Sequence, residues 1–129
     1  MSEFQGPYSL VVIGGGPAGY TAAVRAAQLG MKAALVEAEE ELGGICLNWG
    51  CIPTKSLLRQ AELFRLFQRA DEFGISAGEV TFDWKKVVAR SRRAAAQLGS
   101  GVDYLMKKNG IALFRGRGRL TPVKDVEVH

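Results

Sequence analysis

The 129-residue sequence predicts an α/β fold built on a parallel β-sheet. The first observation is that an apolar run, a glycine cluster and an alanine-rich run follow one another over residues 8–30, in the order of a strand, a tight turn and a helix. The second is a further apolar run directly afterwards, at residues 32–37. The third is a long periodic stretch at residues 84–105, which predicts a helix that leads to another apolar run. Strands that alternate with helices are typical of parallel sheets.

The first unit has the spacing of a dinucleotide-binding turn. We expect a strand at Tyr8–Ile13, a helix at Ala18–Leu29 and a second strand at Lys32–Glu37. The glycines before the helix form the pattern G-x-G-x-x-G, which is weak evidence when it stands alone. Here a strand precedes it, a helix follows it and an acidic residue ends the next strand, so we predict a Rossmann-like domain.

Each residue of this turn has an expected role in binding a dinucleotide. Gly14 makes the turn, Gly16 lets the backbone approach a pyrophosphate, and Gly19 allows close packing of the helix. Pro17 and Ala18 open the helix, where backbone amides and the helix dipole favour phosphate groups.

Glu37 is the expected ribose ligand, because a carboxylate at the end of the second strand can accept hydrogen bonds from ribose hydroxyls. The alternative is a solvated acid beside the glutamates at 39, 40 and 41. The spacing favours the ribose ligand, and we assign the three later glutamates to a solvent-exposed loop.

The two cysteines, Cys46 and Cys51, lie between two glycine turns and a helical run. Zinc is disfavoured because a site needs about four ligands and the chain adds only His129. A structural disulfide would close a very small loop, which stabilises least. A pair made for redox turnover is the remaining interpretation.

A regular helix across both cysteines is excluded for such a pair. Residues five apart are separated by about 7.5 Å along a helix axis, whereas a disulfide joins Cα atoms about 4.4–6.8 Å apart. Gly50 and Pro53 predict the necessary distortion, because glycine loosens the backbone and proline disfavours a helical residue before it.

The segment from Gly43 to Lys55, GGICLNWGCIPTK, closely resembles the redox-active segment of the flavin-dependent pyridine nucleotide–disulfide oxidoreductases. The motif is long and specific, and its CLNxGCIP form is most similar to the branch that oxidises dihydrolipoamide. The resemblance implies that Cys46 exchanges with a dithiol substrate and that Cys51 is the charge-transfer thiol beside the flavin. It also implies that Lys55 lies near flavin N5, with Gly44 among the cofactor contacts.

Ile45 and Trp49 stand where many relatives carry Thr and Val. These departures leave the implied thiol chemistry intact, but they do not identify the substrate. A glutathione- or mercuric-reductase-like enzyme, or a non-catalytic flavin-binding or interaction module, therefore remains an alternative.

Two long helices are expected after the cysteines. The first covers Ser56–Arg69 and places Leu57, Ala61 and Phe64 on one face. A connection over residues 71–81 leads to Asp83, the expected N-cap of a helix that runs to Lys108. The apolar seam of that helix is expected at Trp84, Val88, Ser91, Ala95, Leu98, Val102 and Leu105, packed on the preceding helix or a partner subunit.

The net charge of +4 and the basic residues of the second long helix raise the possibility of a nucleic-acid ligand. We reject it because these residues surround an apolar seam and do not alternate with stacking aromatics. No apolar run approaches the about 20 residues of a membrane span, and residues 1–9 lack the pattern of a signal peptide. We expect a cytoplasmic protein, in which a dithiol pair is more often catalytic than structural.

The last part of the chain predicts a third strand at Ile111–Phe114 and the first strand of a β-meander at Val123–Val128. Between them lies Arg117, flanked by glycines. By the resemblance, its backbone meets the adenine end of FAD.

The resemblance covers only the N-terminal part of the family pattern. Residues 1–129 are therefore expected to be a truncated, incomplete FAD-binding domain, and the NAD-binding and dimerisation domains are absent from the chain. The implied full-length enzyme is a homodimer that takes electrons from a dithiol, the lipoyl group on an acyltransferase, through FAD to NAD. The chain alone is expected to be inactive, because it holds one fingerprint and lacks the histidine–glutamate pair of the family.

Overall fold

The computed structural model describes residues 6–123 and 125–129. In chain order its elements are β1 (Leu10–Ile13), α1 (Pro17–Gln28), β2 (Ala33–Glu37), α2 (Gly44–Asn48), α3 (Cys51–Gln68), the 3₁₀ turn η1 (Ala70–Phe73), α4 (Trp84–Lys108), β3 (Ala112–Arg115), β4 (Gly118–Leu120) and β5 (Val126–Val128). Residue 124 of the predicted last strand and residues 1–5 lie outside this description.

The predicted parallel sheet is confirmed. Its strand order is β1-β2-β3, with Leu10 beside Ala33 and Ala34 beside Ala112. The central strand β2 is buried from Ala33 to Val36, as its uninterrupted apolar sequence requires. The carboxyl ends of β1 and β2 meet at one edge of the sheet, where the glycine turn and Glu37 lie.

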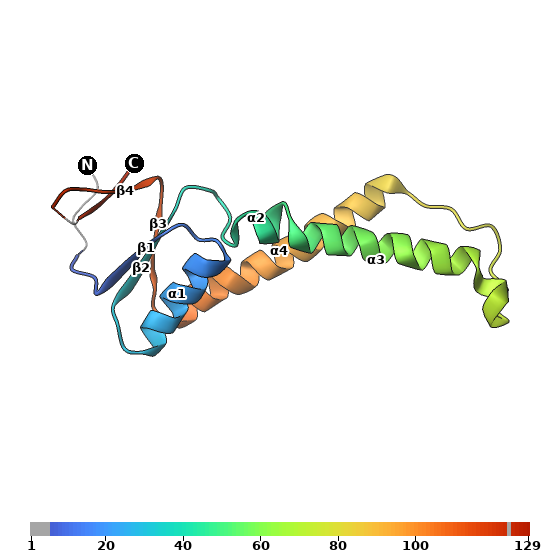
Figure 1. The fold of residues 1–129 in the computed structure, drawn as a ribbon, viewed down its shortest axis with the longest axis horizontal. Coiled ribbons are helices and arrows are strands. Elements are labelled where there is room, and N and C mark those ends of the chain that lie inside the picture. Colours follow the sequence, from blue (N-terminus) through green and yellow to red (C-terminus); the bar gives the residue numbers. More distant parts are fainter. Residues whose placement is uncertain (1–5, 124) are drawn as a thin grey trace.

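Helices α1 and α4 cover one face of the sheet, with α2 beside them (Figure 1). The core between them holds Ala23 and Ala26 of α1, Leu35 of β2, and Val102 and Met106 of α4. The small side chains of α1 let that helix approach the strands closely. This face of the sheet is therefore covered by apolar side chains.

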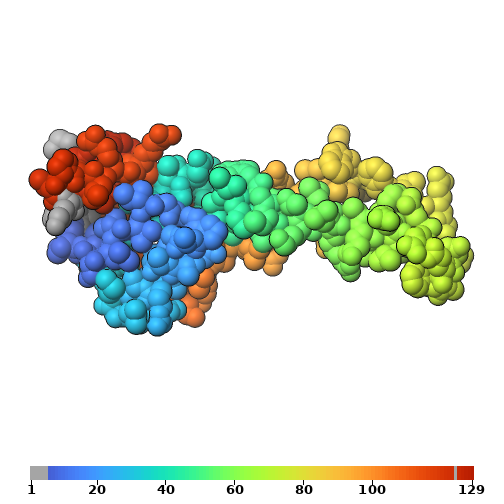
Figure 2. Space-filling model, in the orientation of Figure 1, coloured from blue at the N-terminus to red at the C-terminus, as the bar shows by residue number. Residues whose placement is uncertain are grey.

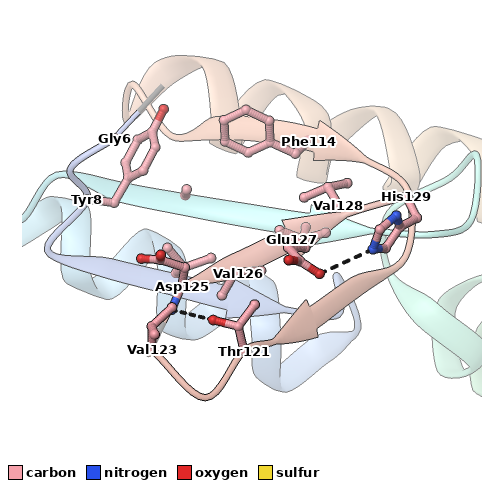
Figure 3. Close-up of a pocket in the computed structure, with 13 residues that line it drawn as sticks. Gly6, Tyr8, Phe114, Thr121, Val123, Asp125, Val126, Glu127, Val128 and His129 are labelled. Atoms are coloured by element: carbon pink, nitrogen blue, oxygen red, sulfur yellow. Dashed lines mark hydrogen bonds and ion pairs between the residues drawn. The ribbon is translucent and has the colours of Figure 1, made fainter. Parts of the chain in front are cut away.

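The opposite face of the sheet, reached by alternate residues of the strands, is covered by a β4–β5 hairpin in place of a single strand. A cavity of about 770 Å³ lies between them, lined by Val11, Val36, Phe114 and hairpin residues that include Glu127 and His129 (Figure 3). In it the Glu127 carboxylate lies 3.5 Å from Nε2 of His129.

Helix α3 and the first half of α4 form an arm that projects from the α/β body (Figures 1 and 2). The 25 residues of α4 make a rod of about 37 Å, so one helix belongs to both the body and the arm. Near the arm's end the rings of Phe64 and Phe82 pack edge to face with centroids 5.5 Å apart. Several large apolar side chains along the arm are exposed: Leu58, Phe67, Phe73, Ile75, Phe82 and Trp84.

The predicted seam of α4 is partly wrong. Ser91, Ala95 and Val102 are buried, but Leu98 is 47% exposed and Trp84 is 61% exposed. The buried side of α4 continues from Ala95 to Met106 past the partly buried Gly99, where an added Cβ would lie 3.9 Å from the Leu47 side chain. Helix α2 contacts α4 beside Gly99, one position beyond the predicted Leu98, and a strict heptad spacing does not predict that shift.

The remaining differences concern boundaries. Helix α3 begins at Cys51 and not Ser56, and Ala61 of its predicted face is exposed because α4 covers only a narrow side of the arm. The connection expected between the two long helices contains the turn η1. The last predicted strand is shorter than expected and covers only Val126–Val128. It pairs with β4, a strand that the sequence did not predict. Asp83 is the N-cap of α4 as predicted, because its Oδ1 accepts from the Lys86 N–H at 3.2 Å.

Candidate active site

The glycine turn connects β1 to α1 with the geometry that its sequence predicts. Gly14 has a φ of +101°, which favours glycine, and its N–H donates to the Val36 carbonyl at 2.8 Å. A Cβ on Gly19 would lie 1.8 Å from the Gly14 carbonyl oxygen, so the helix can start this close to the strand only with glycine there.

The start of α1 can hold an anionic group. Its N-cap, Gly16, provides no side-chain hydrogen bond, so the first-turn amides keep their donors for a ligand. A hollow of about 500 Å³ lies over Gly14, Gly16, Pro17, Ala18 and Gly19. A Cβ on Gly16 would meet no atom closer than 4.0 Å, so the open side of the turn leaves room for a ligand.

Glu37 lies beside this turn, as its position at the strand end requires. Its Oε2 accepts from the Gly15 N–H at 2.6 Å and its Oε1 accepts from the Glu39 N–H at 2.9 Å. The carboxylate thus fixes the shape of the glycine turn, a role that the sequence did not predict.

The cysteines lie on either side of a break between two helices. Cys46 is in α2, and Cys51 is the first residue of α3. A Cβ on Gly50 would lie 2.9 Å from the Ile45 carbonyl oxygen, so glycine is needed at the break. Pro53 falls in the first turn of α3, where its missing N–H removes no hydrogen bond. The predicted distortion is therefore a clean interruption between the two thiols.

Both thiols are free, with Cys46 partly buried and Cys51 exposed. The pKa of the Cys46 thiol is raised, first because its side chain hydrogen bonds to Cys51, and then through desolvation and the charge of Cys51. The positive charge of Lys55 acts in the opposite sense and lowers that pKa. The structure thus brings Cys46, Cys51 and Lys55 together, with the two cysteines as free thiols.

The glycine turn and the cysteine segment touch through their backbones. The Gly43 N–H donates to the Gly15 carbonyl at 2.8 Å. Gly44 has a φ of +61°, and a Cβ on it would lie 2.8 Å from the Gly16 Cα. Gly44 therefore lets the dithiol segment lie directly against the turn that is predicted to bind a dinucleotide.

Arg117 lies apart from the thiols, at the start of the hairpin. Its N–H donates to the His129 carbonyl at 2.8 Å, and its own carbonyl accepts from the His129 N–H at 3.1 Å. The backbone contact predicted for Arg117 thus competes with this pairing in the structure.

Two polar contacts near Cys46 were missed by sequence reasoning. Asn48 is 4% exposed and its Nδ2 donates to the Leu42 carbonyl at 3.1 Å. Arg92 donates from Nη1 to the Asn48 carbonyl at 2.8 Å. A polar residue inside an otherwise apolar CLN segment is the signal that could have revealed Asn48; nothing in the spacing of α4 marks Arg92.

Among the described residues no group of three or more His, Cys, Asp or Glu side chains is arranged to hold a metal ion. The helices of the same residues include none with the length and apolarity of a membrane span. The site is therefore described by its turn, its dithiol and the contacts between them.

Together, the parallel sheet, the glycine turn and the adjoining thiols place this chain in the class of dinucleotide-binding α/β domains that carry a dithiol. The sequence pattern of the pyridine nucleotide-disulphide oxidoreductase family matches residues 8–129. The chain belongs to that family.

Several relatives support the same assignment. The chain is 54% identical over 114 residues to a dihydrolipoyl dehydrogenase of Zymomonas mobilis, covering 88% of this chain and 24% of the relative. It is 48% identical over 123 residues to one from Acholeplasma laidlawii, covering 95% and 36%. It is 54% identical over 112 residues to one from Mycobacterium tuberculosis, covering 86% and 24%.

A solved structure is similar as well. The Cu(II) complex of the HOCl-induced flavoprotein disulfide reductase RclA from Escherichia coli superposes with a TM-score of 0.78 at 27% identity. The match covers 97% of this chain and 25% of that one. The chain thus spans about a quarter to a third of the length of the relatives it matches.

Proposed function

We propose that the protein to which this chain belongs is a dihydrolipoyl dehydrogenase, which oxidises a lipoyl dithiol and reduces NAD. The observation that carries the proposal is the Cys46–Cys51 dithiol, placed across a helix break and against the glycine turn. The names of the similar proteins support the choice of substrate. We further propose that residues 1–129 are the N-terminal, incomplete FAD-binding domain, and that the NAD-binding and dimerisation domains of a homodimer lie in the additional length of the relatives.

The residues at the turn fit FAD. The uncapped amides of α1 and the hollow over Gly14 and Gly16 suit the diphosphate, and Glu37 suits the ribose. Gly44, Cys46, Cys51 and Lys55 form the end of the site that would face the flavin. Arg117 would face the adenine. When bound, FAD would supply the two-electron acceptor between this dithiol and NAD.

In the proposed reaction the oxidised pair Cys46–Cys51 meets a substrate that carries two thiols. A substrate thiolate attacks the Cys46 sulfur, the Cys46–Cys51 bond breaks, and Cys51 leaves as a thiolate. The second substrate thiolate then attacks the substrate sulfur in the mixed disulfide and releases Cys46. The substrate leaves as its disulfide, and the chain holds two reduced cysteines and both electrons.

The test uses the longer protein that contains this chain, loaded with FAD. We expect dihydrolipoamide to reduce NAD in its presence and Cys46→Ser to abolish that turnover, because no mixed disulfide can form. Cys46→Ser should still bind FAD. Turnover that prefers NADPH and glutathione disulfide over dihydrolipoamide would assign the substrate to the glutathione-reductase-like alternative. Full lipoamide turnover by Cys46→Ser would reject the role of the pair.

A further inference from the structure

We propose that Asn48 and Arg92 are positioning residues of the redox pair, which hold α2 so that Cys46 stays within reach of Cys51. The inference rests on the proposed function, because it assigns to these residues the geometry that the dithiol chemistry needs. Neither residue belongs to the pair or to the glycine turn, and Arg92 comes from the distant helix α4.

Helix α2 cannot hold its own position. It has five residues, far fewer than the about 12–15 that an isolated helix needs to be even marginally stable in water. Neither of its ends carries a capping side chain of its own, since Gly43 precedes it and Trp49 follows it. The orientation of Cys46 therefore depends on contacts from outside the helix.

Asn48 supplies the contact at the entry to α2. Its side chain is buried and donates to the carbonyl of Leu42, a residue that is 1% exposed in the core. Leu42 precedes Gly43, whose N–H is bonded to Gly15 of the glycine turn. The Asn48 side chain thus connects the carboxyl end of α2 to the residues before its amino end, which contact the glycine turn.

Arg92 supplies the contact at the exit. The last carbonyls of a helix have no partner within it, and the Arg92 guanidinium donates to the Asn48 carbonyl at 2.8 Å. A cation at a helix carboxyl end also interacts favourably with the dipole. Because α4 is 25 residues long and packed in the core by Val102 and Met106, Arg92 is held by a rigid element.

Arg92 affects the cysteines through the position of α2 and not through its charge. The charges that shift the pKa of Cys46 are those of Cys51 and Lys55, and Arg92 is not among them. Without Arg92, the carboxyl end of α2 loses the side-chain hydrogen bond that it receives from α4. Helix α2 can then rotate, and Cys46 can turn away from Cys51. The expected effect is a less stable disulfide.

The experiment measures formation of the Cys46–Cys51 disulfide in the longer protein that contains this chain. The protein is equilibrated with reduced and oxidised glutathione, so that one glutathione disulfide is consumed and two glutathiones form for each Cys46–Cys51 bond, and the products are trapped with acid and counted by mass spectrometry. Four proteins are compared: the unmodified protein, Arg92→Met, Arg92→Lys and the matched control Arg93→Met. Arg93 is the next residue of α4 and is exposed, so its variant loses the same charge from the same helix.

For Arg92→Met we expect the equilibrium constant for disulfide formation to fall five- to tenfold, a reduction potential about 20–30 mV less negative. Arg92→Lys keeps a donor with poorer reach and is expected two- to threefold below the unmodified protein. Arg93→Met is expected within twofold of it. If circular dichroism shows that Arg92→Met is unfolded, the comparison of Arg92→Lys with Arg93→Met decides.

Equal constants for the Arg92 variants and Arg93→Met would overturn the positioning role and leave the proposed function intact. An unmodified protein that forms no Cys46–Cys51 disulfide at any glutathione ratio would overturn both. The two failures are therefore distinguishable.

Discussion

At the scale of single residues, the site depends on which groups face the two sulfurs. Cys51 raises the pKa of the Cys46 thiol, and the positive charge of Lys55 acts to lower it. The long motif predicted that both cysteines and Lys55 lie together, and their roles toward a flavin stay predictions. It could not reveal Asn48 and Arg92 as contacts, since those depend on where α4 crosses α2.

The pH dependence of Cys46 alkylation in the reduced chain tests this balance. Cys51 raises the pKa of Cys46, so Cys51→Ala should lower it, increase the thiolate fraction at a given pH and move the inflection of the rate to lower pH. Lys55 lowers that pKa, so Lys55→Met should move the inflection to higher pH. Iodoacetamide rates from pH 6 to 10, located by peptide mass, are the measurement. Lys85→Met on the arm is the control, and an inflection that stays in place in both site variants would contradict the assignment.

A second residue-scale prediction separates the proposed roles of the thiols in the longer protein with FAD bound. Cys46→Ser should leave a free Cys51 thiolate and a long-wavelength absorption band without any reductant, and the band should fade as pH falls through the pKa of that thiol. Cys51→Ser should lack the band, while Cys46 stays open to alkylation. Visible spectra recorded against pH would show reversed roles if only Cys51→Ser carried the band.

At the scale of elements, the site is built where helices start and stop. The three strands of the parallel sheet, α1 and the long helix α4 follow from patterns that are local in sequence, so they were predicted within a few residues, whereas β4 was not. The α2–α3 break was expected as a distortion because Gly50 and Pro53 are local signals. The position of Gly99 beside α2 was not, because the place where α2 contacts α4 depends on residues that are far apart in the sequence.

The closest approach between elements predicts the effect of Gly19→Ala. The new methyl group would overlap the Gly14 carbonyl, which is backbone and cannot rotate away, so α1 must shift. We expect a loss of about 1–3 kcal/mol in the free energy of unfolding, measured by urea denaturation. Gly78→Ala is the matched control because a Cβ there meets no atom within 4 Å. Equal stabilities of the two variants would refute the packing role of Gly19.

At the scale of the whole molecule, a compact α/β body carries a long helical arm (Figures 1 and 2). The arm exposes Phe67, Phe73 and Trp84, and the sheet face under the hairpin keeps an open cavity. Composition alone could not predict this shape, because the fraction of apolar residues is the same whether they are buried or exposed.

The coverage of the relatives predicts the behaviour of the isolated chain. It matches 24–36% of the length of the dihydrolipoyl dehydrogenases and contains one glycine fingerprint. The purified 129-residue chain is therefore expected to show no dihydrolipoamide-dependent NAD reduction and only weak FAD binding. Assays of turnover and of flavin retained after gel filtration are the measurements, with the longer protein as the positive control. Stoichiometric yellow flavin on the isolated chain would contradict the second expectation.

The hydrogen bond from Gly43 to Gly15 has a thermodynamic consequence. It joins the segment that carries Cys46 to the turn that is proposed to hold FAD, so movement of one segment changes the free energy of the other. Coupling between two binding events is reciprocal. Whatever factor cofactor binding applies to the equilibrium between dithiol and disulfide, oxidation of the cysteines must apply the same factor to the affinity for the cofactor.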